Sequence, residues 1–198
     1  MWNEMGNQPA IITAPGHRFP WYVRLFFWNQ RRRYGAVLEP ARLWGRSPKV
    51  FIAVALLFGA LDRRSSPIEP RLRSLITVRV SQINWCAFCV DINSSLVLKR
   101  GGDVEKLAQL AQFESSTRFD AREKAALAYA EAITYSDRHP TAEHFVRLRQ
   151  YFDDDAIIEL TGIIAFQNLS SKFNAALGVE AQGFCAAAPQ AKKPAPGT

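Results

Sequence analysis

Cysteine is scarce in this 198-residue sequence, which has only three. So few thiols exclude a small domain held together by several disulfides. Long apolar runs are lacking too: Val50–Leu61 has no charge over twelve residues, whereas a membrane-spanning helix needs roughly 20. No cleavable signal pattern follows Met1. We therefore expect a cytoplasmic protein that has no membrane partner.

An excess of acidic residues is absent as well, and the net charge is +7. The first 73 residues hold 12 Lys and Arg against 4 Asp and Glu, a net charge of +8, and the rest hold 13 against 14. The triplet Arg31–Arg33 lies beside aromatic residues and could contact nucleic acid or anionic lipid. It also suits the last turn of a helix ended by Gly35, because cations there oppose the helix dipole. We favour the helix end and expect no nucleic-acid partner.

The residues that are present are typical of a globular domain, with 48% hydrophobic and 22% charged. We predict an N-terminal arm and aromatic helix in residues 1–46, a helical domain in residues 47–185 and a disordered tail in residues 186–198. The tail has prolines among alanines and lysines and little to bury. The aromatic segment Phe19–Tyr34 would expose a large apolar patch unless something covers it, and we favour a second protomer.

Local signals predict where several helices begin. Ser47 followed by Pro48 is typical of a helix start. Asp120 with Glu123 three residues later predicts a capping box, and the acidic run Asp153–Asp155 favours the start of a long last helix. From residue 103 onward, the pattern is helical throughout.

One segment is ambiguous from its pattern alone. In Arg71–Ile83, apolar residues alternate as in a strand but also recur with helical spacing. Beyond it, Asn84 is expected to cap a helix over Trp85–Lys99, which Gly101 would end.

The feature of the sequence that indicates a chemical activity is the pair Cys86 and Cys89, which are separated by two residues. At the first turn of a helix, free backbone N–H groups and the positive end of the helix dipole stabilise a thiolate. The second sulfur lies one turn away, where it can attack a sulfenic acid or a mixed disulfide formed on its neighbour. This spacing therefore predicts reduction of a peroxide by a thiolate, followed by closure of a disulfide.

Three alternatives to this redox chemistry stay open for the cysteine pair. A zinc site would need His139 and His144, which lie too far along the chain for finger-type spacing, so we expect no metal. A thioredoxin-like protein, suggested by Trp85, would need a sheet for which strands are lacking. Two inert buried cysteines are the remaining alternative. The third cysteine, Cys185, is a packing residue or a mobile redox partner.

The stretch Leu72–Asn93 resembles the core motif of the carboxymuconolactone decarboxylase and alkylhydroperoxidase D superfamily. The segments Asp120–Ala130 and Phe152–Asn168 resemble its later helices, so that the likeness covers about residues 47–178. It implies an all-α fold, an alkylhydroperoxidase D-like helical bundle, and it makes Arg71–Ile83 a helix.

The resemblance also implies roles for individual residues. Cys89 passes through the sulfenic acid, and Cys86 donates a proton and closes the disulfide. The family's proton relay has a glutamate where this chain has Ser74 and a histidine where it has Asn93. An asparagine side chain can hydrogen-bond a thiolate or a water but cannot accept a proton at neutral pH. The general base is thus missing, which could slow turnover by about 10²–10⁴-fold unless another group replaces it.

Three residues could by their type supply that base, namely Glu123, Glu159 and His144. We predict a thiol oxidoreductase that reduces peroxide or organic hydroperoxide, needs no cofactor and is recycled by an external dithiol reductant. The family implies a homo-oligomer, a dimer or a trimer of dimers. The alternatives are a catalytically weakened binding or assembly protein of the same fold, and a basic module that binds membrane or nucleic acid.

Overall fold

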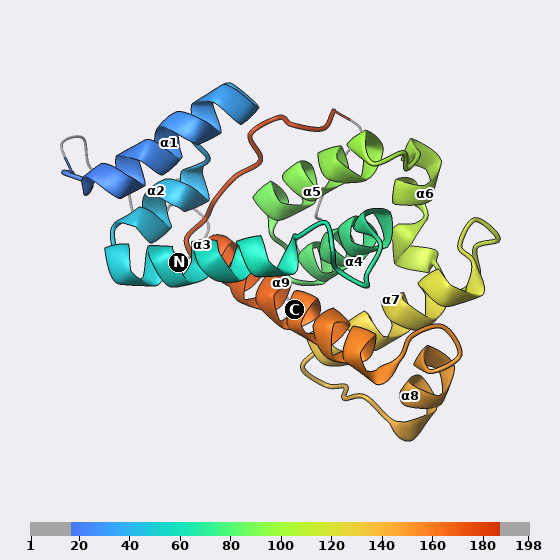
Figure 1. Ribbon diagram of the computed structural model, residues 1–198. Coiled ribbons are helices and arrows are strands. Elements are labelled where there is room, and N and C mark those ends of the chain that lie inside the picture. Colours follow the sequence, from blue (N-terminus) through green and yellow to red (C-terminus); the bar gives the residue numbers. More distant parts are fainter. Residues whose placement is uncertain (1–16, 187–198) are drawn as a thin grey trace, which may run out of the picture.

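The chain is helical throughout the part that its computed structural model describes, residues 17–186 (Figure 1). No strand occurs within that range, which confirms the all-α prediction and makes the ambiguous segment a helix. The helices are α1 Trp21–Tyr34, α2 Glu39–Gly45, α3 Pro48–Leu61, α4 Pro70–Ile83, α5 Ala87–Lys99, α6 Val104–Ala108, α7 Ala121–Thr134, α8 Ala142–Leu148 and α9 Asp154–Ala176, with a 3₁₀ turn at Leu110–Gln112.

Helix α4 is the centre of the fold, because nine of its 14 residues are buried. Its apolar side chains Leu75, Ile76 and Val80 are fully enclosed, and the helix packs against α5, α7 and α9. A helix that is apolar on several sides must be covered on several sides. The cysteine pair immediately follows this central helix.

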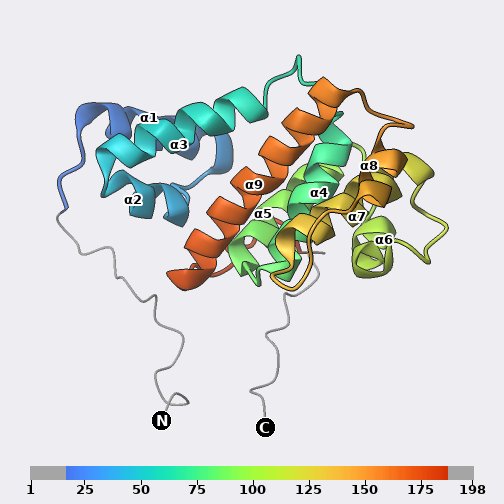
Figure 2. The same cartoon turned by 90° about the horizontal axis from the view of Figure 1, so that it is seen from below.

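The N-terminal helices α1, α2 and α3 gather on one side of α9, with α6 and α8 on the other (Figure 2). Val23, Ala41 and Phe51 form the small core of this group. The Trp44 ring of α2 stacks on Phe173 of α9, with ring centroids 3.6 Å apart, which ties the group to the main bundle.

The aromatic helix is covered in part by its own chain. Phe26 and Phe27 pack on the N-terminal core, whereas Trp21 and Trp28 are more than half exposed. A second protomer is therefore not needed for most of the rings, and the expected subunit contact stays a prediction.

The helix starts that local signals predict are present in the structure, except for one; in addition, one helix was not expected. The capping box of Asp120 and Glu123 forms, and Asp153 caps α9. The prediction that Asn84 caps the next helix is wrong: α5 begins at Ala87, and its N-cap is Cys86. Helix α2 was not expected, since seven residues are too few to show a period.

Beyond α9 the chain turns back and runs between α1 and α5 (Figure 1). The carboxylate of Asp91, a buried residue of α5, accepts hydrogen bonds from the backbone N–H groups of Gln182, Phe184 and Cys185. The predicted arm up to residue 16 and the predicted tail after Ala186 lie outside the described residues. Among residues 17–186, no helix is both long and apolar enough to span a bilayer.

Candidate active site

A tight reversal between α4 and α5 positions the cysteine pair. The Cys86 N–H donates to the carbonyl of Ser81 (3.0 Å), and the Trp85 N–H donates to that of Gln82 (3.2 Å). Together these bonds form a Schellman motif, in which the residue at C′ is left-handed. That residue is Trp85, with φ 49°, a backbone region that bulky side chains rarely adopt. The reversal presents the first turn of α5 to the end of α9.

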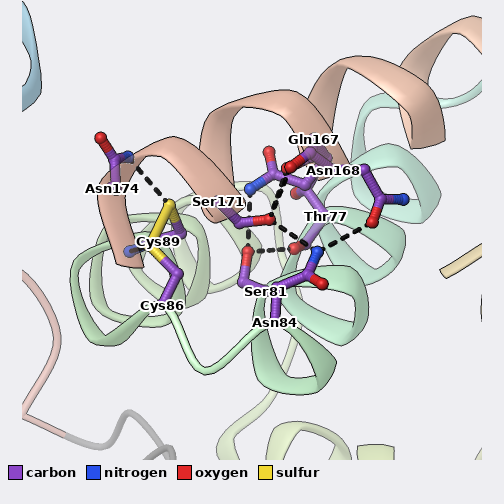
Figure 3. The surroundings of a disulfide bond; sticks show 9 residues. All are labelled: Thr77, Ser81, Asn84, Cys86, Cys89, Gln167, Asn168, Ser171 and Asn174. Atoms are coloured by element: carbon purple, nitrogen blue, oxygen red, sulfur yellow. Dashed lines mark hydrogen bonds between the residues drawn. A yellow bond between two sulfur atoms is a disulfide. The ribbon is translucent and has the colours of Figure 1, made fainter. Parts of the chain in front are cut away.

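Cys86 and Cys89 are joined by a disulfide, with their Cα atoms 5.2 Å apart (Figure 3). Both residues are buried, with 0% and 2% of their surface exposed. The Cys86 sulfur accepts a hydrogen bond from the Cys89 backbone N–H at 3.2 Å, as an N-cap side chain does. Cys86 is therefore the sulfur that lies at the N-terminus of α5.

The sulfur of Cys89 has a different partner, contributed by α9. The side-chain amide of Asn174 donates to Cys89 Sγ at 3.2 Å (Figure 3). Asn174 is 1% exposed, and its Oδ1 has no hydrogen-bond partner among the described residues. A buried amide oxygen without a partner costs free energy, so its presence here calls for an explanation such as a functional role.

A polar network lies beside the disulfide, between α4 and α9 (Figure 3). The amide nitrogen of Gln167 donates to Ser81 Oγ at 2.9 Å. The Asn84 amide nitrogen donates to Ser171 Oγ at 2.8 Å and to Asn168 Oδ1 at 2.9 Å. These bonds fix α9 in register against α4 and so hold Asn174 at the disulfide.

An apolar cavity of about 260 Å³ opens beside Cys89. Cys89 is in its wall, whereas Cys86 is not and lies behind its partner. The wall comes from the N-terminal helices α1, α2 and α3 on one side and from α5 and α9 on the other. Cys89 is therefore the cysteine of the pair that a molecule in this cavity would contact.

The two remaining predicted site residues, Asn93 and Ser74, border one small cavity, but Ser74 does not reach the cavity at Cys89. Asn93 borders the cavity that contains Cys89 and also a smaller one of about 50 Å³, which Ser74 lines. The Ser74 hydroxyl accepts a hydrogen bond from Arg100 Nη1 at 2.8 Å, and Arg100 also pairs with Asp62. Ser74, which stands where the family's relay has a glutamate, is thus hydrogen-bonded to a guanidinium.

None of the three acid–base candidates borders the cavity at Cys89. Glu123 is paired with Lys106 at 2.6 Å, and His144 belongs to a capping box with Thr141. Glu159 binds Arg63 and Ser66. Burial acts to raise the pKa of Glu159, but these two hydrogen bonds and the positive charges of Arg63 and Arg73 together outweigh it, and the pKa lies below its usual value.

The residues considered for zinc are also separate from the cysteines. His139 and His144 line another cavity, along α7 and α8. Within residues 17–186, no group of three or more His, Cys, Asp or Glu side chains is placed to hold a metal ion. Cys185 is unpaired with another cysteine and half-buried, held near α5 by its backbone bond to Asp91.

Comparison with known proteins identifies the family. Residues 48–132, from α3 to α7, match the carboxymuconolactone decarboxylase family. The uncharacterized protein YnjA of Escherichia coli is 42% identical over 173 residues, which cover 86% of this chain and 94% of that protein. The chain belongs to this family.

Two solved structures have the same fold as this chain. The debrominase Bmp8 has a TM-score of 0.72 and 25% identity, covering 82% of this chain and 87% of the other. A peroxidase-related protein from Ralstonia eutropha, with an alkylhydroperoxidase AhpD core, has a TM-score of 0.77 and 20% identity, covering 90% and 93%. The second likeness is one of fold alone.

Sequence reasoning missed two buried polar residues: Asn174, which donates to Cys89, and Asp91, which holds the C-terminal segment on α5. A signal for the first was present: Gln167, Ser171 and Asn174 recur at helical spacing and so share one face of the last helix. A polar stripe on a buried helix indicates polar partners opposite. Nothing local distinguishes Asp91 from an exposed helical aspartate.

Proposed function

We propose that the protein is a thiol peroxidase that uses Cys89 as nucleophile and Cys86 as resolving thiol. The observation that carries the proposal is the asymmetry of the pair: Cys89 borders a cavity, whereas Cys86 does not line it, is fully buried and caps the N-terminus of α5. The family supports a peroxidase-related enzyme, because one of its solved neighbours is named as such.

The chemistry takes two steps that balance. The Cys89 thiolate attacks one oxygen of the peroxide, the O–O bond breaks, and the departing oxygen takes a proton to leave as water or alcohol. The Cys86 thiolate then attacks the sulfur of the sulfenic acid, the S–O bond breaks as the disulfide forms, and the departing hydroxide takes a proton to leave as water. Two electrons and two protons from an external dithiol restore both thiols.

The test is an assay of thiols and sulfenic acid on the reduced protein. One equivalent of hydrogen peroxide should remove two titratable thiols and form a Cys86–Cys89 disulfide. Cys89→Ser should abolish labelling of sulfenic acid, and Cys86→Ser should let it accumulate because the resolving thiol is gone. Cys185→Ser is the matched control and should behave as the unaltered chain.

Two results would contradict the proposal. If both thiols stay titratable after peroxide, the weakened binding or assembly protein is favoured instead. If sulfenic acid accumulates in Cys89→Ser, the two roles are reversed.

A second candidate function is reductive removal of a halogen. It is favoured by the apolar cavity at Cys89 and by the 25% identity to a debrominase, which was solved with 2,3,4-tribromopyrrole. In that reaction the dithiol would supply two electrons, a carbon–bromine bond would become carbon–hydrogen, and bromide and the disulfide would be the products. Bromide release from 2,3,4-tribromopyrrole by the reduced protein would support it, whereas thiol loss with peroxide alone would not.

A further inference from the structure

The segment that follows α9, residues 177–186, packs against the surroundings of the cysteine pair. It runs back between α1 and α5 (Figure 1). Cys86 and Cys89 are buried in one apolar cluster, to which this segment contributes Val179. Phe184 of the same segment packs against that cluster. The segment is therefore part of the cover that keeps the disulfide out of solvent.

The ring of Phe184 also supports the wall of the cavity at Cys89. Its centroid lies 6.4 Å from that of Phe88 and 6.1 Å from that of Tyr34. Phe88 and Tyr34 line the cavity, whereas Phe184 does not. The segment thus stands behind the cavity wall, and displacing it would widen the way from solvent to the cysteine pair.

The size of the cavity limits which reductants can use it. Its volume of about 260 Å³ is near the low end of small-molecule sites, which typically span roughly 300–1,000 Å³. A folded protein is wider than a single helix, which with its side chains measures about 10–12 Å across. A small dithiol can enter such a space, but a protein dithiol needs another route to the disulfide. Displacing residues 177–186 would provide one.

One buried carboxylate, that of Asp91, holds the segment in place. Its Oδ2 accepts hydrogen bonds from the backbone N–H groups of Gln182 at 2.9 Å and Phe184 at 3.0 Å. Its Oδ1 accepts one from the N–H of Cys185 at 2.7 Å. Asp91 is 3% exposed, and no ion pair within residues 17–186 involves it. These backbone donors therefore supply the stabilisation that a buried carboxylate needs.

The middle of the segment is less firmly attached. Residues 180–183 are exposed, and the Gln182 side chain adds a tie at the surface, where it accepts a hydrogen bond from the Glu39 N–H at 3.1 Å. A stretch of chain with few buried contacts opens at a low cost in free energy. Loss of the bonds to Asp91 should thus be enough to release the segment.

We propose that residues 177–186 form a strap held by Asp91, and that release of this strap admits a protein dithiol as the reductant of the cysteine pair. This inference rests on the proposed thiol peroxidase, because it concerns the step that recycles the enzyme. A thiolate of the reductant attacks one sulfur of the pair, the S–S bond breaks, and the other sulfur leaves as a thiolate that takes a proton. The second thiol of the reductant then attacks the mixed disulfide. Its proton passes to the freed cysteine, and the reductant is left as its own disulfide.

The first test follows opening of the strap without redox chemistry. In the disulfide form Cys185 is the one free thiol among the three cysteines, so its alkylation by iodoacetamide reports release of the strap. Asp91→Asn removes the charge and leaves one acceptor oxygen where two are used, and it should speed alkylation about tenfold or more. Glu180→Gln is the matched control, because Glu180 is an exposed carboxylate of the same strap, and it should leave the rate unchanged.

The second test compares reductants of two sizes on the disulfide form, with the appearance of thiols as the measurement. Reduction by thioredoxin should become about tenfold faster in Asp91→Asn, whereas reduction by dithiothreitol, which can reach Cys89 through the cavity, should change less than about threefold. Phe184→Ala keeps the bonds to Asp91 but removes the ring behind the cavity wall. It should also raise the thioredoxin rate selectively, which keeps the test valid if Asp91→Asn does not fold.

Three results would overturn the proposal. Unchanged alkylation of Cys185 in Asp91→Asn would show that this carboxylate does not hold the strap. Faster alkylation without faster reduction by thioredoxin would show that the strap does not limit access. Equal acceleration of both reductants would point to general loosening of the site. If the strap behaves as proposed but peroxide leaves both thiols of the reduced protein titratable, control of disulfide reduction stands and the peroxidase fails.

Discussion

At the scale of single residues, the site depends on how each sulfur is held. Cys86 is stabilised by backbone at the start of α5, and Cys89 depends on the side-chain amide of Asn174. The amide that donates to Cys89 is neutral and buried. A charge introduced at residue 174 should therefore shift the pKa of the Cys89 thiol. Under the proposed function, Asn174 is a positioning residue for Cys89.

Asn174→Asp should raise the pKa of the Cys89 thiol, because a carboxylate replaces the amide donor and repels the thiolate. A rise of about one unit reduces the thiolate fraction near neutral pH about tenfold. The measurement is the thiolate absorbance of Cys89 against pH in a Cys86→Ser background. Asn174→Leu, which removes the donor without adding charge, should shift the curve less; equal shifts would contradict an electrostatic role.

The missing base leads to a second prediction at this scale. Asn93→His combined with Ser74→Glu should speed oxidation of Cys89 near neutral pH on the order of tenfold or more, since general-base assistance typically contributes 10²–10⁴-fold. The new glutamate would lie beside Arg100, which now binds the serine. Rapid-mixing kinetics with peroxide would measure the rate, with Asn93→Ala as control. An unchanged rate would show that the surroundings of Cys89 differ from the family's in more than these two residues.

At the scale of elements, the connector between α3 and α4 is attached to α9 through one carboxylate. Glu159 accepts hydrogen bonds from Arg63 and Ser66 of that connector. Arg73 holds the start of the same connector through the carbonyl of Leu61, at 2.6 Å. These bonds orient α3, which supplies part of the cavity wall, against the main bundle.

Glu159 should make stability depend on pH in the acidic range. Its pKa is lower in the folded chain than in the unfolded one, so its contribution is present above the unfolded pKa, roughly 4.3, and is lost as pH falls through the folded pKa. The difference in free energy of unfolding between the unaltered chain and Glu159→Gln should be full near pH 6 and shrink below about pH 4. Urea denaturation at several pH values measures it. The exposed Glu180 provides the control, Glu180→Gln; a difference that stayed constant with pH would contradict the assignment.

At the scale of the whole molecule, α3 leaves an apolar face exposed. Only Phe51 of this helix is buried, and the exposed large residues on it are Val50, Ile52, Leu56, Leu57 and Phe58. A contiguous apolar patch on a helix is typical of an interface between protein chains. We therefore expect the homo-oligomer to use α3, with Trp21 and Trp28 of α1 as further candidates.

Leu56→Asp should shift the particle to a smaller mass, because a buried unpaired carboxylate disfavours the subunit contact. The mass from light scattering coupled to size exclusion should fall toward 22.3 kDa, that of one chain. Val146→Asp is a matched control, since Val146 is similarly exposed but lies on α8, away from α3 (Figure 2). A single-chain mass for the unaltered protein would rule out this assembly.

The features that could be predicted from the sequence depend on residues that are close together along the chain. Helix starts at Asp120 and Asp153 were predicted, because a capping side chain bonds backbone groups only two or three residues away. The closeness of Cys86 and Cys89 was predicted from their spacing, because the two residues lie within one helical turn whatever surrounds them. The helical state of residues 71–83 needed the family resemblance, since their apolar pattern fits two periods.

Other features depend on contacts between distant parts of the chain. Asn174 is 85 residues from Cys89, and the hydrogen bond between them exists only because the network of Asn84 and Ser171 sets the register of α9 on α4. The cavity, likewise, lies between α1–α3 and the α5–α9 pair. Short-range bonding therefore accounts for the cysteine motif and the helix ends. Which side chains meet at the sulfur depends on core packing, because close-packed interiors admit few alignments of one helix on another.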